Sequence, residues 1–153
     1  MKRYVLLSLI FTCVTITLLA PQVSRASKAL EPRVRFAPVD IYLDSGSSPL
    51  AAYQFELKVT KGEVKIVGVE GGEHAAFQEA PYYDPAALMK DRIIIAAFNT
   101  GRDLPTGRTR IARLHLQITG DAEPRYELEL TITGNAEGRE LPAEITLETG
   151  ENP

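Results

Sequence analysis

Apolar and polar residues alternate along most of the chain beyond residue 38. The clearest run covers residues 53–60, where polar side chains alternate with Tyr53, Phe55, Leu57 and Val59. A period of two is typical of a β-strand that buries one face. The same alternation predicts strands at residues 39–44, 64–69, 112–118, 126–132 and 145–147.

One further segment, at residues 92–98, is apolar on both faces, which predicts a central strand covered on both sides. Clusters of Gly, Ser and Pro separate the segments and are typical of turns. Only residues 85–90 indicate a short helix, with Asp84 as its N-cap and Pro85 as its first residue. About eight or nine short strands in one domain predict an all-β fold, a single antiparallel β-sandwich.

The alternation also predicts how two of these strands pair. If residues 120–124 form a hairpin loop, Leu116 lies opposite Leu128 on the inner face, and His115 lies opposite Glu129 on the outer face. Apolar residues then meet apolar residues, and a slip by one position would expose every leucine. The sequence therefore predicts a hairpin between the strands at 112–118 and 126–132.

The N-terminus has the layout of a secretory signal peptide. A basic start at residues 1–3 precedes 17 uncharged, mostly apolar residues, 4–20, and Ser24 and Ala26 provide the small residues of a cleavage site. The alternative is an uncleaved anchor, because 17 residues are near the lower limit of a bilayer span. We expect a signal peptide at 1–26, an N-terminal extension at 27–37 and a domain at 38–150, secreted to the periplasm or the exterior.

Removal of residues 1–26 changes the charge and the thiol content. It takes away three of the 17 basic residues and none of the 20 acidic ones, which leaves a net charge of −6. An acidic protein of this kind is not expected to bind nucleic acid, whose phosphates attract basic surfaces. The only cysteine, Cys13, is also lost, so the mature domain has no disulfide and must be stabilised by its core.

No set of residues in the sequence points to catalysis. His74 and His115 lack a second metal ligand at a suitable spacing, and His74, in a predicted loop, is interpreted as a solvated surface residue. Carboxylates pair at strand spacing in two places, Asp40/Asp44 and Glu127/Glu129. Such pairs serve glycoside hydrolysis, but the polar outer face of any strand has the same pattern. We expect no enzyme activity, no cofactor and no metal site, and the sequence does not decide whether calcium binds.

The most unusual segment is residues 77–85, in which adjacent tyrosines, Tyr82 and Tyr83, lie between prolines. Two interpretations are open: the tyrosines form an aromatic contact surface for a sugar or a protein, or they cover one end of the sandwich. Tyr42 is out of phase with its apolar neighbours and is a second candidate for an exposed aromatic residue.

Several of these strands resemble a known family. Residues 39–43, a Ser/Gly turn and residues 50–59 resemble the opening of a cohesin-type domain, and residues 64–72, 93–99 and 109–116 resemble its later strands. The resemblance covers about residues 36–149 and implies a jelly-roll-like sandwich of the cohesin and carbohydrate-binding-module type. The turn after the second strand departs from the family, because Thr60-Lys61-Gly62 stands where cohesins usually carry Tyr-Asp-Pro.

The resemblance implies a secreted, non-catalytic module that docks a partner protein, such as a dockerin-like or envelope protein. Alternation places four candidate contact residues on an outer sheet face, Arg113, His115, Glu127 and Glu129. The alternative is a carbohydrate-binding module in which Tyr82, Tyr83 or Tyr42 stacks on sugar rings. A small enzyme and a structural subunit of an envelope assembly are further hypotheses, because a fold does not determine a function.

Overall fold

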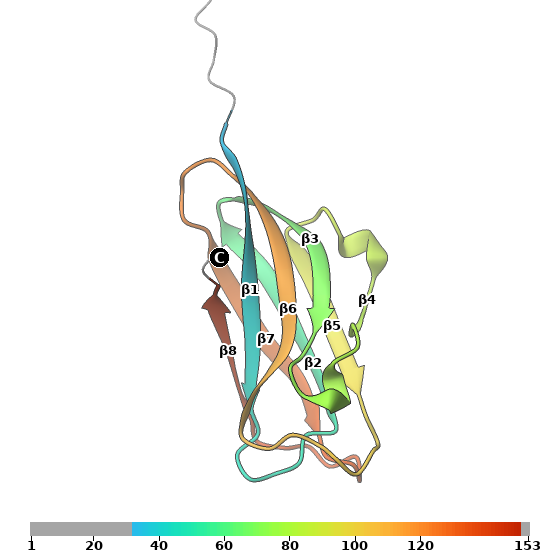
Figure 1. Cartoon of the computed structure of the whole chain (residues 1–153). Coiled ribbons are helices and arrows are strands. Elements are labelled where there is room, and N and C mark those ends of the chain that lie inside the picture. Colours follow the sequence, from blue (N-terminus) through green and yellow to red (C-terminus); the bar gives the residue numbers. More distant parts are fainter. Residues whose placement is uncertain (1–31, 151–153) are drawn as a thin grey trace, which may run out of the picture. The chain divides into compact units, whose positions relative to one another are not determined.

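The computed structural model describes residues 32–150, so the predicted signal peptide at residues 1–26 lies outside the described residues. Two antiparallel four-stranded sheets face each other (Figure 1). Sheet A has the strand order β3 (Glu63–Gly71), β6 (Arg108–Thr119), β1 (Val34–Asp44) and β8 (Glu144–Thr149). Sheet B has the order β4 (Tyr82–Tyr83), β5 (Arg92–Phe98), β2 (Ala52–Lys61) and β7 (Arg125–Gly134). The prediction of an all-β sandwich is confirmed.

The predicted segments all form strands, with small differences at their ends. Strand β1 begins at Val34, inside the segment that the sequence assigned to an N-terminal extension. The expected helix at 85–90 is shorter, a 3₁₀ helix, η2 (Pro85–Ala87). Its predicted cap is confirmed, because an Asp84 carboxylate oxygen accepts a 2.9 Å hydrogen bond from the Ala86 N–H.

The predicted hairpin between residues 112–118 and 126–132 is wrong. Strand β6 pairs with β1 and β3 in sheet A, whereas β7 pairs with β2 in sheet B, where Leu128 lies opposite Leu57. Every connection between consecutive strands passes from one sheet to the other, except the one between β4 and β5. A period of two determines which face of a strand is buried, but both sheets present that face to the same core. The pattern therefore fits a crossing between sheets as well as a hairpin.

The core consists of the apolar inner faces of both sheets, and Tyr53, near the start of β2, is one of its largest buried side chains. Its ring is 2% exposed and meets Phe77 edge-on at a centroid distance of 5.1 Å. Its hydroxyl donates a 2.9 Å hydrogen bond to the carbonyl oxygen of Ile111 on the opposite sheet. Burial raises the pKa of Tyr53 well above its ordinary value of 10.0, so the hydroxyl stays a donor.

Two glycines allow the chain to turn closely from β3 towards the aromatic segment. A Cβ atom at Gly71 would lie 2.2 Å from the carbonyl oxygen of Gln78, and one at Gly72 would lie 2.4 Å from that of Arg110. Phe77 is buried and ends the 3₁₀ helix η1 (Ala75–Phe77), which fixes the path of the chain towards Tyr82. The position of β4 therefore depends on the absence of side chains at two residues.

We expect Gly71→Ala to destabilise the domain by roughly 2 kcal/mol or more, because backbone oxygens must move to admit a methyl group. Urea unfolding followed by circular dichroism measures the change. Gly68→Ala is the matched control, since a Cβ there meets the His115 ring at 3.4 Å, an ordinary contact. Equal stabilities for the two variants would contradict this explanation of the close turn.

Candidate functional site

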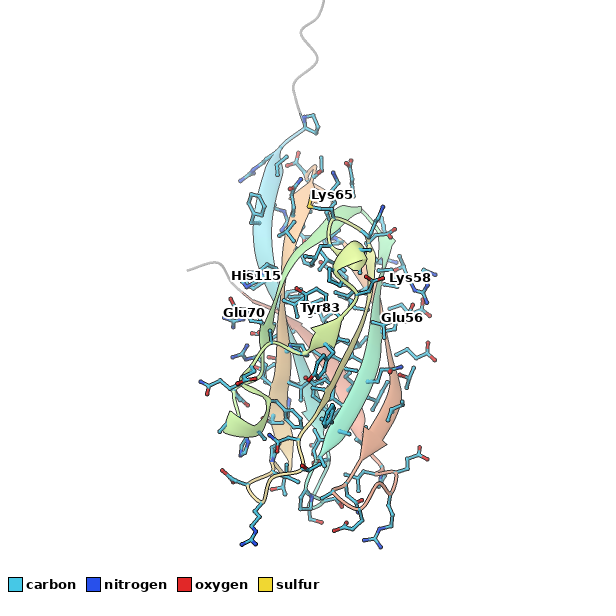
Figure 2. All side chains as sticks on the ribbon, turned by 90° about the vertical axis from the view of Figure 1, so that its right-hand side faces the viewer. Glu56, Lys58, Lys65, Glu70, Tyr83 and His115 are labelled. Atoms are coloured by element: carbon cyan, nitrogen blue, oxygen red, sulfur yellow. The ribbon has the colours of Figure 1, made fainter. Side chains whose placement is uncertain are left out.

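The four charged candidates from the sequence lie on opposite faces of the sandwich. Arg113 and His115 are on the outer face of sheet A, and Glu127 and Glu129 are on the outer face of sheet B. Figure 2 shows this separation, with Glu70 beside His115 on one side and Glu56 and Lys58 on the other. The expectation that the four candidates share one surface is wrong, because it rested on pairing β6 with β7.

The outer face of sheet A is a network of paired charges. Both carboxylate oxygens of Asp40 accept hydrogen bonds from the Arg113 guanidinium, at 2.7 and 2.8 Å. Arg110 Nη1 lies 3.6 Å from Asp40 Oδ1, and His115 Nε2 lies 2.7 Å from Glu70 Oε1. These contacts pair Asp40 with Arg113 and Glu70 with His115, whereas the buried Arg110 Nη1 lies near Asp40 without a hydrogen-bond partner among the described residues.

Tyr42 belongs to the same face and does not present a free ring. The Arg108 guanidinium carbon lies 3.6 Å from the centroid of its ring, an attractive cation–π contact. Arg108 also donates a 2.5 Å hydrogen bond to Glu148. A sugar could stack on Tyr42 from this side only by displacing an ion-paired arginine.

The outer face of sheet B is divided into a charged half and an apolar half. Rows across β5, β2 and β7 place Arg92, Lys58 and Glu127 side by side, followed by a row that contains Glu56 and Glu129. Arg92 donates hydrogen bonds of 2.5 and 2.7 Å to the Glu56 carboxylate. In the part of the chain that the structure describes, Glu129 has no ion-pair partner.

The apolar half is the largest departure from a polar outer surface. Its members come from β2, β4, β5 and β7, and we call them the apolar patch: Ala52, Tyr82, Ile94, Ala96, Phe98 and Ile132. The exposed fractions are 69% for Tyr82, 67% for Phe98, 52% for Ile132 and 46% for Ile94. The rings of Tyr82 and Phe98 are nearly parallel, at 11°, with centroids 6.0 Å apart.

The prediction that β5 is covered on both faces is therefore wrong. Ile93 and Ile95 are buried in the core, but Ile94 and Phe98 face outwards, and no element of residues 32–150 covers them. An apolar run indicates burial on both faces, and the sequence contains no signal that one face is left open. The open face is a candidate interaction surface, since soluble proteins rarely expose large contiguous apolar patches without a function.

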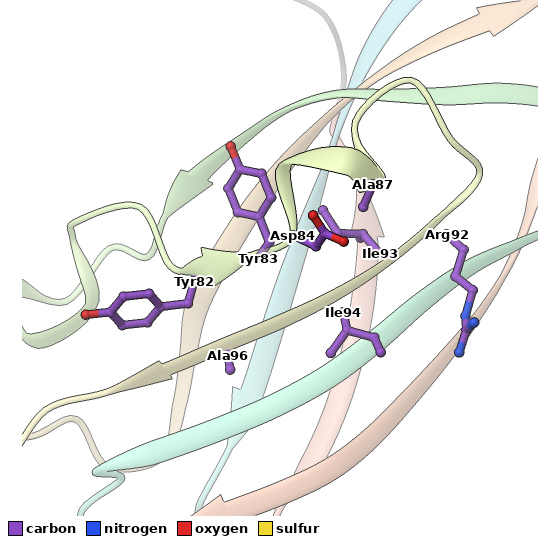
Figure 3. Close-up of a pocket in the computed structure, with 8 residues that line it drawn as sticks. All are labelled: Tyr82, Tyr83, Asp84, Ala87, Arg92, Ile93, Ile94 and Ala96. Atoms are coloured by element: carbon purple, nitrogen blue, oxygen red, sulfur yellow. The ribbon is translucent and has the colours of Figure 1, made fainter.

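A groove of about 490 Å³ runs along the edge of β5, next to the apolar patch (Figure 3). Its lining comes from β4, η2 and β5: Tyr82, Tyr83, Asp84, Ala87, Arg92, Ile93, Ile94 and Ala96. Each of the two interpretations of the tyrosine pair fits one of the two residues. Tyr82 is exposed and borders the groove, whereas Tyr83 is half-buried and packs against the core.

The sequence did not identify Ile94, Phe98 and Ile132 as candidates. By alternation Ile132 has the phase of Leu128 and Leu130 and is expected to face the core. The register between β2 and β7 shifts by one residue, so that Leu130 lies opposite Phe55 but Ile132 lies opposite Gln54. This irregularity turns Ile132 to the outer face, and nothing in the local sequence marks it.

The described residues contain no arrangement that points to catalysis or metal binding. No group of three or more His, Cys, Asp or Glu residues in 32–150 is placed to hold a metal ion. His74 is not freely solvated as predicted: it is half-buried and caps η1, because its Nδ1 accepts a 3.2 Å hydrogen bond from the Ala76 N–H. In residues 32–150, no helix is both long and apolar enough to cross a membrane.

No protein-family model matches the sequence, and neither the curated proteins nor the solved structures contain a match. The resemblance to cohesin-type domains therefore stays a prediction.

The ion pair of Asp40 predicts how stability depends on pH. Hydrogen bonding to Arg113 holds the pKa of Asp40 below its ordinary value of 3.8, although burial acts in the opposite direction. A lowered pKa in the folded state adds stability above the unfolded-state pKa, and this contribution disappears as the pH falls through the folded-state value.

We expect Asp40→Asn to cost about 2 kcal/mol at pH 7, because it leaves Arg113 without its carboxylate. The cost shrinks below about pH 4, where the native carboxylate also becomes protonated. Urea unfolding of both proteins between pH 7 and pH 2 measures this difference. A cost that does not change with pH would contradict the electrostatic explanation.

Proposed function

We propose that this protein is a secreted, non-catalytic docking module that binds a partner protein through the apolar patch of sheet B. The observation that carries the proposal is the contrast between the two outer faces. Sheet A pairs Asp40 with Arg113 and Glu70 with His115 and exposes large apolar residues, Val34 and Phe36, only near the start of β1. Sheet B exposes four large apolar side chains over β4, β5 and β7: Tyr82, Ile94, Phe98 and Ile132. Large apolar side chains with a polar rim are the anatomy of a protein interface.

The charges beside the patch indicate what the partner carries. Glu129 lies opposite Glu56 across β2 and β7, and the single cation bonded to Glu56 is Arg92 on the far side. Arg92 bonds to Glu56, and Lys58 lies in the next row, but Glu129 has no ion-pair partner among the described residues, so a cation brought by a partner would pair with it. The proposed partner presents an apolar surface that is flanked by a lysine or arginine.

The same proposal includes the location and the type of fold. Residues 1–26 direct export and are removed, and the domain acts in the periplasm or outside the cell. The sandwich is of the jelly-roll-like, cohesin type that residues 39–59 resemble. Nearly every connection between consecutive strands passes from one sheet to the other, which is compatible with that type.

We expect Phe98→Ala to weaken partner binding at least about tenfold, because Phe98 is an exposed aromatic side chain that stacks with Tyr82 in the apolar patch, and such aromatic anchors contribute strongly to interfaces. Mature protein from Ser27 is the bait, and the secreted and envelope fraction of the producing organism is the source of the partner. Binding of the retained protein is then measured with wild type and variant by surface plasmon resonance.

His115→Ala is the matched control on sheet A, and it is expected to bind like the wild type. Both substituted side chains are on outer faces, so both variants are expected to keep the stability of the wild type. If Phe98→Ala binds the partner as tightly as the wild type, or if only His115→Ala loses binding, the interface does not lie on the apolar patch.

A second candidate function, polysaccharide binding, is favoured by one observation. The rings of Tyr82 and Phe98 are both exposed and lie within 11° of parallel, and stacking on sugars uses exposed aromatic faces. If this candidate is correct, soluble polysaccharides retard the wild-type protein in native gels, and Tyr82→Ala abolishes the retardation. Unchanged migration across a panel of glucans, mannans and xylans would exclude these polymers as ligands.

A further inference from the structure

Strand β2 divides the outer face of sheet B into two sides of different shape. On the side of β5 and β4, the rings of Phe98 and Tyr82 protrude and stack on each other, and these residues are 67% and 69% exposed. On the side of β7, Gly134 stands at the position that matches Phe98, because both residues pair with Ala52 of β2. One side of the apolar patch therefore carries large rings, and the other side has no side chain in the same row.

The side of β7 is also hollowed. A hollow of about 350 Å³ lies beside this strand, and its lining includes Ala52, Ile132, Gly134, Gly138 and Glu140. A Cβ atom at Gly134 would lie 3.8 Å from the Cβ atom of Ala52, so this position faces outwards together with Ala52. Because Ala52 and Ile132 belong to the apolar patch, the hollow adjoins the patch on the side opposite to the two rings.

The charged half of this face is divided along the same line. One row places Arg92 on β5, Lys58 on β2 and Glu127 on β7. Glu129 also lies on β7, and it has no ion-pair partner among residues 32–150. The side with the rings thus has a cation, and the side with the hollow has two carboxylates.

A two-fold axis that runs along β2, between two copies packed face to face, exchanges these two sides. Packed sheets lie about 10 Å apart, a distance that long side chains from both faces bridge. The rings of each copy then lie over the hollow of the other, and Arg92 of each copy lies opposite Glu127 of the other. Every contact about such an axis occurs twice. An axis across the strands would instead place rings on rings and hollow on hollow, so the face is complementary to itself in one orientation.

We propose that the apolar patch binds a second copy of this chain about a two-fold axis along β2. This inference rests on the proposed docking function and identifies the partner at that site. The partner is required to present an apolar surface flanked by a lysine or arginine, and the patch itself is flanked by Lys58 and Arg92. One face of this chain thus has both the carboxylate that needs a cation, Glu129, and the cations that a partner has to bring.

The charges on the axis and the size of the face indicate how tightly the two copies bind. Lys58 approaches its own copy, and the two Glu127 carboxylates in the same row offset this repulsion. Glu56 also approaches its own copy, but each Glu56 is already bonded to Arg92. The four strands offer roughly 500 Å² per copy, which is at the lower limit of a specific interface. We expect a dissociation constant in the micromolar range.

The first test measures the mass of the mature protein from Ser27 by sedimentation equilibrium, at concentrations between about 1 μM and 1 mM. The expected result is a change from monomer to dimer within this range. Phe98→Ala is expected to weaken the dimer at least about tenfold, because it removes a ring that enters the hollow. A wild-type protein that stays monomeric at about 1 mM would overturn the proposal.

The second test fills the hollow. Gly134→Val is expected to weaken the dimer about tenfold or more, because the new side chain takes the place of the other copy's rings. The fold admits this change, since a Cβ there meets its nearest neighbours at 3.7 and 3.8 Å, which are ordinary contacts, and valine is favoured in strands. Thr146→Val, on the outer face of sheet A, is the matched control and is expected to leave the dimer unchanged. A dimer that is equally tight in both variants would show that the hollow is not part of the interface.

The third test exchanges charges between copies. Glu127→Arg and Arg92→Glu are each expected to weaken the dimer about tenfold, because each places like charges opposite one another twice. An equimolar mixture of the two variants is expected to bind as tightly as the wild type, since both contacts then join opposite charges. Lys65→Glu makes the same change in charge on sheet A and is not expected to restore binding to Glu127→Arg. A mixture no tighter than the separate variants would overturn the orientation of the axis.

The outcomes separate this inference from the docking function. If the wild type is monomeric, but Phe98→Ala loses a different protein that the wild type retains from the envelope fraction, the docking function stands and self-association fails. If the wild type is monomeric and Phe98→Ala retains that protein as tightly, both fail.

Discussion

The inner faces of the two sheets can be buried only against each other, and the rest of the molecule depends on this constraint. Consecutive strands lie in opposite sheets, so neither sheet can be completed from one continuous part of the chain. The buried hydrogen bond from Tyr53 to the Ile111 carbonyl joins the two sheets across the core near the starts of β2 and β6. Burial of apolar area provides the main stabilisation, and this bond removes the cost of placing a hydroxyl and a carbonyl there.

The two outer faces meet solvent in opposite ways. On sheet A, Asp40, Arg113, His115 and Glu70 bond to one another, and Arg108 covers Tyr42. On sheet B, large apolar side chains such as Tyr82 and Phe98 are exposed, and Gln54 is the polar residue that lies between Ala96 and Ile132. One face thus pairs several of its charges within the fold, while the other exposes large apolar side chains of the kind that protein interfaces bury.

Much of the fold was predictable from the sequence, because a period of two in residues such as Tyr53, Phe55 and Leu57 directly reflects burial of one strand face. Strand pairing was not, because Leu116 and Leu128 face the same core whether or not their strands are neighbours. The site was predictable only at Tyr82. Ile132 faces outwards because of a register shift, and the exposure of Ile94 depends on what lies over β5, so neither leaves a local signal.

The pairing of β1 has a consequence for the order in which the protein can be completed. Among the strands of residues 32–150, the first, β1, bonds to β6 and to β8, which is the last. During vectorial synthesis or translocation, β1 has neither of its neighbours in the sheet until β6, at residues 108–119, has emerged. Pairing between strands so far apart in the sequence slows folding, because long loops must close before these contacts can form.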